Sequence, residues 1–239
     1  LNGGQNWYKF TNNMPSANVH FIELHKKTND LVIATHGRGI VIIDDISVLR
    51  QLTPENMDKE LYFFKTKASV IPEDNGFGGA STETQFIGEN PSTSAKIIYY
   101  LKKRHVLGKM SLEIQDANGN RITDIGPGKA KGINVVNWNF TTKPPKVATG
   151  KTFTFGGFTT PRVPAGTYKV VIQKGKETYT NDLVVEYDSK SLVSLADRKA
   201  QEAATKKMFD MSQELAYLVY TMDEYLNMAE QAKAKNPKA

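Results

Sequence analysis

The residues of this chain best suited to binding an anion stand in the segment His36-Gly37-Arg38-Gly39. An imidazole and a guanidinium separated by one glycine could together hold a carboxylate or another anion through charge-assisted hydrogen bonds. The glycines Gly37 and Gly39 also supply the positive φ angles that a tight connection requires. His36 and Arg38 could equally stabilise a hairpin tip by bonding to neighbouring loops, and we favour this structural role.

The carboxylates and the other histidines nearby do not form a catalytic set. Asp44 and Asp45 are adjacent, so on a strand they point to opposite faces and cannot act as an acid/base pair. We expect Asp45 instead to cap the short turn at Ile46–Leu49. His20 and His25 are five residues apart, which places them on opposite faces of a strand and argues against a shared metal ion. We therefore expect no catalytic residue, no metal and no cofactor in this chain.

These side chains belong to the stretch Asp30–Asp45, whose two apolar arms, LVIAT and IVIID, flank the glycine-containing break. Val, Ile and Thr suit a pleated strand better than a helix, because branching at Cβ crowds the preceding helical turn. The stretch therefore predicts a β-hairpin. Both arms are nearly continuously apolar, so we expect other sheets to cover the hairpin on both faces, which an isolated hairpin cannot provide.

The composition limits the classes of function. A chain of 239 residues is long enough for one large or two ordinary domains. It contains no Cys, which excludes disulfides and thiolate metal sites and fits an oxidising compartment. The net charge of +6 comes mostly from scattered Lys, whereas nucleic-acid binders concentrate basic residues on one stripe, so we expect no nucleic-acid partner. No apolar run is long enough for a transmembrane segment.

The first residues form a glycine-rich turn that ends on an aromatic, Asn2-Gly3-Gly4-Gln5-Asn6-Trp7. This turn resembles the truncated Asp-box of sialidase-like β-propellers, Ser-x-Asp-x-Gly-x-Thr-Trp, with Asn2, Gly4 and Trp7 at the Asp, Gly and Trp positions. We expect Trp7 to plug into the hydrophobic layer beneath. A strand at Val19–His25, the THGRG hairpin and a DD-I turn follow. Together they resemble the closing blade of bacterial Asp-box proteins of the sortilin-like, bacterial-neuraminidase-repeat superfamily.

This resemblance covers about the first fifty residues and implies a β-propeller, whose blades stack face to face. It implies that residues 1–70 form a terminal blade with a closing strand at Leu61–Phe64. The remainder of the propeller would lie upstream of Leu1, so the chain would be a C-terminal piece of a longer protein. The resemblance also implies a protein that is secreted, periplasmic or on the bacterial cell surface.

Residues 71–94 are rich in Gly, Ser, Thr, Asn and Pro, which predicts a linker between domains. From residue 95, short alternating segments with turns such as Asn118-Gly119 predict six or seven strands and an Ig-like β-sandwich over 95–190, with Trp138 in its core. The DANGNRITDI turn, the strand Gly132–Trp138 and PAGTYKV at Pro164–Val170 resemble the Ig-like domain of flagellar hook-capping proteins.

An irregular excursion interrupts this region at Thr141–Arg162, where Phe153, Phe155 and Phe158 stand among Gly, Thr and Lys. These aromatics could stack on a glycan or another partner, which would make the loop a binding surface. They could also pack the loop onto its own sandwich. We favour packing, because an exposed patch of three Phe is an aggregation hazard.

Residues 191–239 predict a C-terminal amphipathic helix that begins at a capping box, Ser194 to Asp197. Its apolar residues recur at alternating steps of three and four, as along one seam of a coiled coil. These seam residues are Met208, Met211, Leu215, Leu218, Met222, Tyr225 and Ala229. In the family that this segment resembles, a second helix folds back on the first. We favour such a helix hairpin; a helix or other protein partner from a second chain stays open, since methionines suit an adaptable interface.

The sequence thus predicts a mainly β fold: the last blade of a β-propeller, then an Ig-like β-sandwich, then a long C-terminal α-helix. We expect a non-catalytic C-terminal region of a secreted or cell-surface Asp-box β-propeller protein that serves assembly or ligand and protein binding. The alternative is the C-terminal part of a sialidase- or xyloglucanase-like glycoside hydrolase whose catalytic residues lie upstream. Fold alone does not decide between them, so whether the parent protein is an enzyme stays open.

Overall fold

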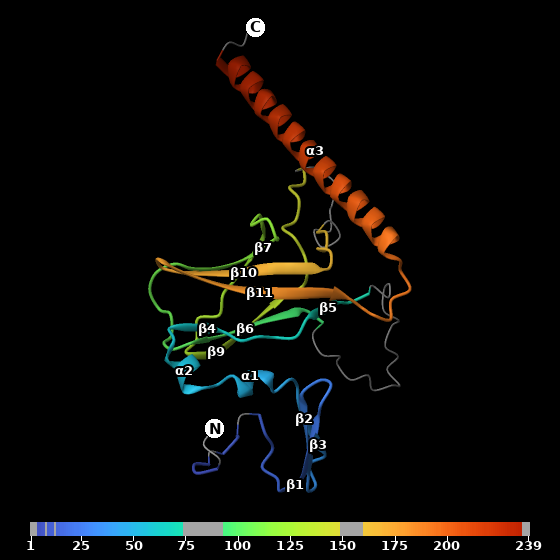
Figure 1. Cartoon of the computed structure of the whole chain (residues 1–239). Helices are drawn as coiled ribbons and strands as arrows, with labels where there is room; N and C mark the ends of the chain where they lie inside the picture. The colour runs from blue at the N-terminus through green and yellow to red at the C-terminus, as the bar shows by residue number, and fades with distance from the viewer. Residues whose placement is uncertain (1–3, 8, 12, 74–92, 149–159, 236–239) are drawn as a thin grey trace. The chain divides into compact units, whose positions relative to one another are not determined.

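The structure of the chain, a computed structural model (Figure 1), describes residues 4–7, 9–11, 13–73, 93–148 and 160–235. The fold is mainly β with one long C-terminal helix, as the sequence predicts. The chain divides into two compact units that alternate along the sequence. The first unit comprises residues 1–67, 97–110 and 127–136, and the second comprises residues 68–96, 111–126 and 137–239.

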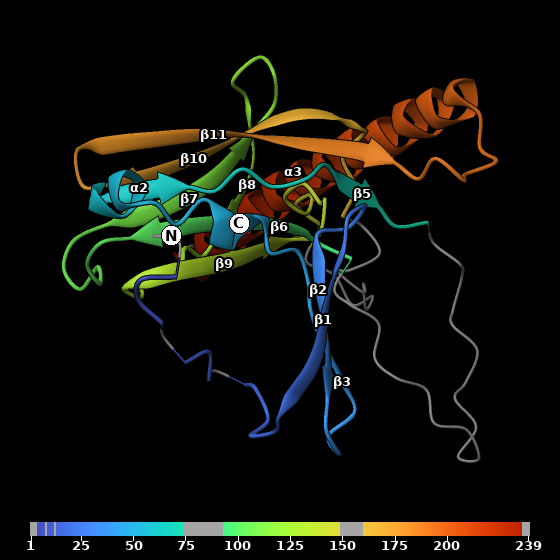
Figure 2. The same cartoon turned by 60° about the horizontal axis from the view of Figure 1, so that its bottom comes forward.

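The first unit contains a three-stranded antiparallel sheet in the order β1-β2-β3, drawn in blue in Figure 2. Its strands are β1 (Val19–His25), β2 (Asp30–Thr35) and β3 (Ile40–Ile43). The strand predicted before the hairpin and the hairpin itself are both confirmed. Gly37 and Gly39, which connect β2 to β3, take φ angles of 70° and 72°. These values lie in the left-handed region, which explains the two glycines.

Two short helices follow the sheet, α1 (Ser47–Arg50) and α2 (Pro54–Asp58). α2 begins where Thr53-Pro54 predicts a helix start. The Thr53 hydroxyl accepts a hydrogen bond from the backbone N–H of Asn56 at 3.3 Å, and Pro54 occupies the first helical position, where no N–H is needed.

A second three-stranded sheet, in the order β4-β6-β9, lies largely in the first unit. Its strands are β4 (Leu61–Phe63), β6 (Ala95–Leu101) and β9 (Gly132–Trp138). We expected Leu61–Phe64 to complete a propeller blade, but β4 pairs with β6, with Leu61 opposite Leu101. This strand therefore hydrogen-bonds to a segment beyond the expected linker and not to the β1-β2-β3 sheet.

The second unit contains a five-stranded sheet in the order β5-β11-β10-β7-β8 (Figure 2). Its strands are β5 (Ser69–Ile71), β7 (Met110–Gln115), β8 (Arg121–Ile125), β10 (Gly166–Lys174) and β11 (Glu177–Tyr187). β7 and β8 form the hairpin predicted from Asn118-Gly119, where Gly119 has a φ of 83°. β5 pairs in parallel with β11, so the strand pairing crosses the domain boundary expected at residue 70.

The core of the second unit includes Trp138, as the sequence predicts. Trp138 is 2% exposed, and its ring lies 5.4 Å from that of Tyr168 and 5.8 Å from that of Phe140, measured between centroids. Its indole N–H donates a hydrogen bond to the carbonyl of Thr141 at 2.9 Å. The polar end of the ring is therefore satisfied inside the core, which a buried Trp requires.

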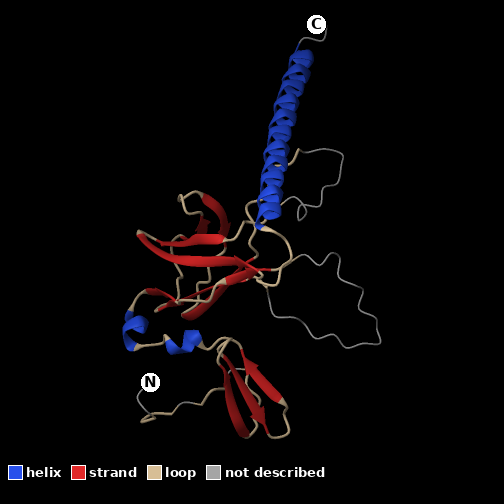
Figure 3. Cartoon of the chain, turned by 45° about the vertical axis from the view of Figure 1, so that its right-hand side comes forward, coloured by secondary structure: helices blue, strands red, loops and turns tan. Residues whose placement is uncertain are grey.

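The long helix α3 (Leu195–Lys235) has 41 residues and is about 60 Å long at 1.5 Å per residue (Figure 3). Its predicted cap is confirmed, because the Ser194 hydroxyl accepts the backbone N–H of Asp197 at 3.1 Å and donates to the Asp197 carboxylate at 2.7 Å. Among the described residues, no helix combines the length and the apolar character that crossing a lipid bilayer requires.

Candidate functional site

The tip of the β2–β3 hairpin carries the imidazole of His36 and the guanidinium of Arg38, which could bind an anion. The backbone N–H of His36 donates to the carbonyl of Asn18 at 2.9 Å. The His36 imidazole stacks on that of His20, with centroids 5.1 Å apart and planes inclined by 20°. Arg38 is exposed. These contacts support the structural role that we favour for His36, while Arg38 remains available to solvent.

The His20–His36 stack is a contact that the sequence did not predict. The register of β1 on β2 shifts between Val19 and Phe21, which is the signature of a β-bulge. A bulge re-aims the side chain within it, and His20 is the residue between the two shifted pairs. Strict alternation of side chains along the strand, on which we based the positions of His20 and His25, does not apply at such a position.

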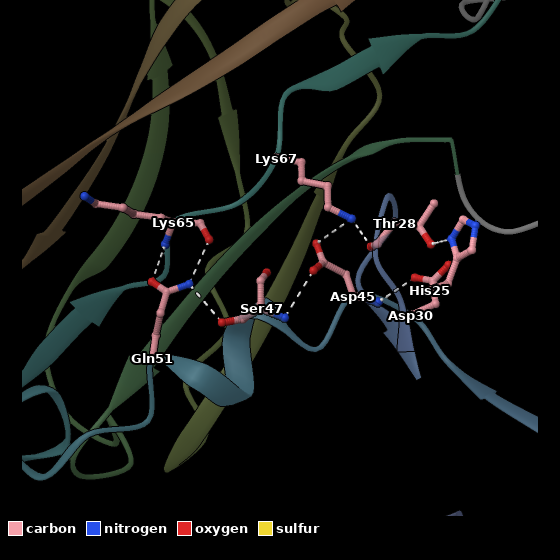
Figure 4. Close-up of polar contacts among 8 residues, drawn as sticks. All are labelled: His25, Thr28, Asp30, Asp45, Ser47, Gln51, Lys65 and Lys67. Atoms are coloured by element: carbon pink, nitrogen blue, oxygen red, sulfur yellow. Dashed lines mark hydrogen bonds and ion pairs between the residues drawn. The ribbon is translucent and has the colours of Figure 1, made fainter. Parts of the chain in front are cut away.

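A polar cluster at the opposite end of the hairpin sheet joins the sheet to the chain ahead of β5 (Figure 4). The Lys67 ammonium donates to the backbone carbonyl of Thr28 and lies 3.8 Å from the Asp45 carboxylate. The backbone N–H of Asp45 donates to the Asp30 carboxylate at 2.9 Å. The Asp45 carboxylate accepts the backbone N–H of Ser47, the first residue of α1, at 3.1 Å. Asp45 therefore bonds to the start of α1, as predicted, although Ile46 is the N-cap residue of this helix and makes no side-chain capping bond.

The electrostatics of this cluster favour an ionised carboxylate. A hydrogen bond from the Thr28 side chain, another from the backbone N–H of Asp45 and the charge of Lys67 hold the pKa of Asp30 below its usual range. A general acid at neutral pH needs the opposite shift. Asp30 therefore acts as a hydrogen-bond acceptor that fixes the turn between β1 and β2.

Gln51, just beyond α1, holds the following segment in the same way (Figure 4). Its side-chain amide donates to the carbonyls of Ser47 at 3.2 Å and Lys65 at 2.9 Å, and its side-chain oxygen accepts the backbone N–H of Lys65 at 2.9 Å. Neither the Gln51–Lys65 pair nor the contacts of Lys67 carried a signal in the sequence, because Lys65 lies 14 residues from Gln51 and Thr28 lies 39 residues from Lys67 along the chain.

Several of the predicted site residues do not combine into a site. Asn2 and the three loop residues Phe153, Phe155 and Phe158 lie outside the described residues. Trp7 packs its ring against Gly4, whose φ of 86° is that of a tight turn. Trp7 is nevertheless 87% exposed, so within this chain it does not enter a hydrophobic layer. Across the described part of the chain, no three His, Asp or Glu side chains are grouped as a metal ion would require.

The β1-β2-β3 sheet presents an apolar surface that the described residues leave uncovered. Cross-strand pairing puts Phe21, Ala34 and Ile40 in one row and Glu23, Val32 and Ile42 in the next row of the same face. We call these six residues the open face. Phe21, Ile40 and Ile42 are 63%, 69% and 60% exposed.

The other face of this sheet is better covered. Ile22, Ile33 and Val41 form its central row. Ile33 is only 4% exposed and Val41 is half-buried, whereas Ile22 on the edge strand β1 is 55% exposed. We expected both faces of the hairpin to be covered, and the structure covers one.

The seam of α3 is likewise uncovered. Its six large residues, from Met208 to Tyr225, are between 54% and 69% exposed, and Ala229 is also exposed. The expected second helix is therefore not supplied by the described part of the chain. Both apolar surfaces, the open face and the seam, are suited to binding another surface and not to a reaction.

Comparison of the chain with protein-family models, with curated proteins and with solved structures gave no match.

Proposed function

We propose that this chain is a non-catalytic region of a secreted or cell-surface Asp-box β-propeller protein and serves in its assembly. In this proposal, β1-β2-β3 belongs to a terminal propeller blade, and the strands from β6 to β11 form an Ig-like domain. The open face of the β1-β2-β3 sheet is the observation that carries the proposal. It would pack against the sheet of a neighbouring blade.

The composition of the open face supports docking to another sheet. Five of its six residues are apolar, and they come from all three strands. A free antiparallel sheet usually carries polar residues on the face that meets water. Contiguous apolar area on a surface is typical of an interaction site, and propeller blades stack by their faces. Glu23, the single charged member, stands on the edge strand β1, where a charge can reach the rim of such an interface.

The charged residues support a structural role. In the polar cluster, Asp30, Asp45 and Lys67 bond to one another or to backbone groups. A catalytic acid and base would need free positions facing a shared substrate. We therefore expect no hydrolysis of a panel of aryl glycosides by the purified chain. Measurable turnover that follows the protein through purification would contradict a non-catalytic role.

The docking itself is testable by hydroxyl-radical footprinting of the native full-length protein beside the isolated chain. The expected result is labelling of Phe21 in the isolated chain and protection of Phe21 in the full-length protein, because a neighbouring blade would cover the open face. Leu107, which is 86% exposed in a loop, serves as the control and should react equally in both. Equal labelling of Phe21 in the two proteins would overturn the proposal.

A further inference from the structure

α3 touches the rest of its unit with a different face from the seam. The partly or fully covered positions in its middle include Phe209, Ser212, Ala216 and Val219, and Ala216 is 8% exposed. Each of these four follows a seam position by one residue, a rotation of about 100° around the helix. The seam therefore lies beside the face that makes these contacts, and within the described part of the chain its residues from Met208 to Tyr225 stay exposed.

The seam is self-complementary in an antiparallel arrangement. Starting midway between Leu215 and Leu218, the seam residues towards the N-terminus match in type those towards the C-terminus. In an antiparallel pair of helices centred there, Leu215 meets Leu218 of the second copy. The layers then pair residues of matched type outward from the centre, Met211 with Met222, Met208 with Tyr225, and Ala204 with Ala229. Every layer joins an a position to a d position, which is how antiparallel heptads interdigitate.

The residues that flank the seam are also compatible with this antiparallel register. Beside the seam, Lys207 would face Met228 and Glu214 would face Thr221 of the second copy. On the other side, Ser212 would face Val219 and Thr205 would face Leu226. No pair brings like charges together, which would destabilise an interface. The aliphatic stem of Lys207 can cover Met228 while its ammonium stays in water.

The position of the sheet on α3 favours antiparallel over parallel pairing. The five-stranded sheet is tied to the beginning of the helix, where the Tyr187 hydroxyl donates to Glu202 at 2.6 Å and Arg198 lies 4.0 Å over the Tyr187 ring. A parallel pair would bring two copies of this sheet to the same end of the helices. An antiparallel pair places them at opposite ends and also opposes the two helix dipoles favourably.

The apolar surface is sufficient for a specific pair. Six seam residues and the flanking Leu226 and Met228, all of them exposed, would be buried on each copy. At about 60 Å² for each of these side chains, the two copies would bury on the order of 1,000 Å². This is near the lower limit for a specific interface, which is typical of pairs that form reversibly.

We propose that α3 is a homodimerisation element in which the seam packs antiparallel against the seam of a second copy of this chain. The proposal is independent of the function proposed for the β1-β2-β3 sheet, because no residue is shared between the two surfaces.

Sedimentation equilibrium of the full chain tests the pairing. The wild-type chain should dimerise reversibly below about 100 µM, and the double variant Leu215→Glu/Leu218→Glu should remain monomeric. The control Asn227→Glu/Gln231→Glu adds the same charge on exposed positions outside the seam and should dimerise like the wild type. Circular dichroism would establish that all three chains keep their helix. A monomeric wild-type chain would overturn the proposal and favour another protein as the partner of the seam.

Disulfide trapping tests the orientation, and the absence of native Cys makes it selective. The variants Met211→Cys and Met222→Cys, mixed under oxidising conditions, should form a cross-linked heterodimer, because these positions meet in the antiparallel register. Met222→Cys alone should form little disulfide. Efficient cross-linking of Met222→Cys with itself would indicate parallel pairing and overturn the proposal as stated.

Discussion

Strand β7 carries polar residues on the face that is turned away from the core, whereas strand β3 carries apolar residues there. In β7, Met110, Leu112 and Ile114 are buried and alternate with Ser111, Glu113 and Gln115. In β3, Ile40 and Ile42 are exposed, and Val41 and Ile43, which alternate with them, are apolar as well. The alternation in β7 gives one face to the protein interior and one to water. The lack of alternation in β3 leaves apolar area exposed, and this is the area that the proposed neighbouring blade would cover.

The largest expected effect comes from the core of the second unit, where the chain needs no outside partner. Trp138→Ala should lower the free energy of unfolding by roughly 3–5 kcal/mol, because it removes a buried aromatic and its packing on Tyr168. Trp7→Ala should change it by less than about 0.5 kcal/mol, since Trp7 is exposed. Urea denaturation would measure both. Similar losses of unfolding free energy in the two variants would show that Trp7 is also covered, and the contrast between a buried and an exposed Trp would not hold.

The two faces of the β1-β2-β3 sheet should differ in the same way. Ile33→Ala should cost about 2–4 kcal/mol, because Ile33 is buried in the central row of the covered face. Ile40→Ala, which truncates an equal side chain on the open face, should cost less than about 0.5 kcal/mol in the isolated chain. Hydrogen exchange of the β2 amides would report the stability of this sheet by itself. An equal cost for both would mean that the open face is packed.

The ionisation of tyrosines should not affect stability at neutral pH and should lower it only at high pH. Burial raises the pKa of Tyr99 and of Tyr168 from 10.0 to about 12. Below pH 10 both tyrosines are protonated in the folded and the unfolded chain and add no pH dependence. Between about pH 10 and 12 the unfolded chain loses these protons first, so the free energy of unfolding should fall as the pH rises.

Denaturation at several pH values would measure this loss. Tyr99→Phe should make it shallower, because one of the two titrating groups is removed. If the free energy of unfolding of Tyr99→Phe fell as steeply with pH as that of the wild type, Tyr99 would titrate as an exposed tyrosine does.

Local patterns predicted most of the individual elements. The glycines at 37 and 39, the Asn118-Gly119 turn and the caps at Thr53 and Ser194 each act on residues within a few positions, so their outcome is decided by short-range sterics and hydrogen bonds. The period of two residues located the strands from β6 to β11, because alternate side chains of a strand always point to opposite faces.

Pairing between distant segments was not predictable in this way. The interaction of β4 with β6 and the parallel interaction of β5 with β11 join segments separated by more than thirty residues. A three-residue strand has no pattern of its own that specifies a partner. The same limit applies to the polar cluster, where Lys67 reaches a carbonyl 39 residues away.

The sequence alone therefore determined where the chain is helical, where it is extended and where it turns, since these choices depend on neighbouring residues. It also determined that α3 carries a heptad seam. Only the tertiary structure decided which apolar surfaces the chain covers itself: the helix packs by the face of Ala216 and leaves Met211 and Leu218 to water, and the sheet covers Ile33 and leaves Ile40 exposed. Burial depends on what lies across from a residue, and that neighbour is supplied by distant segments that no local pattern specifies.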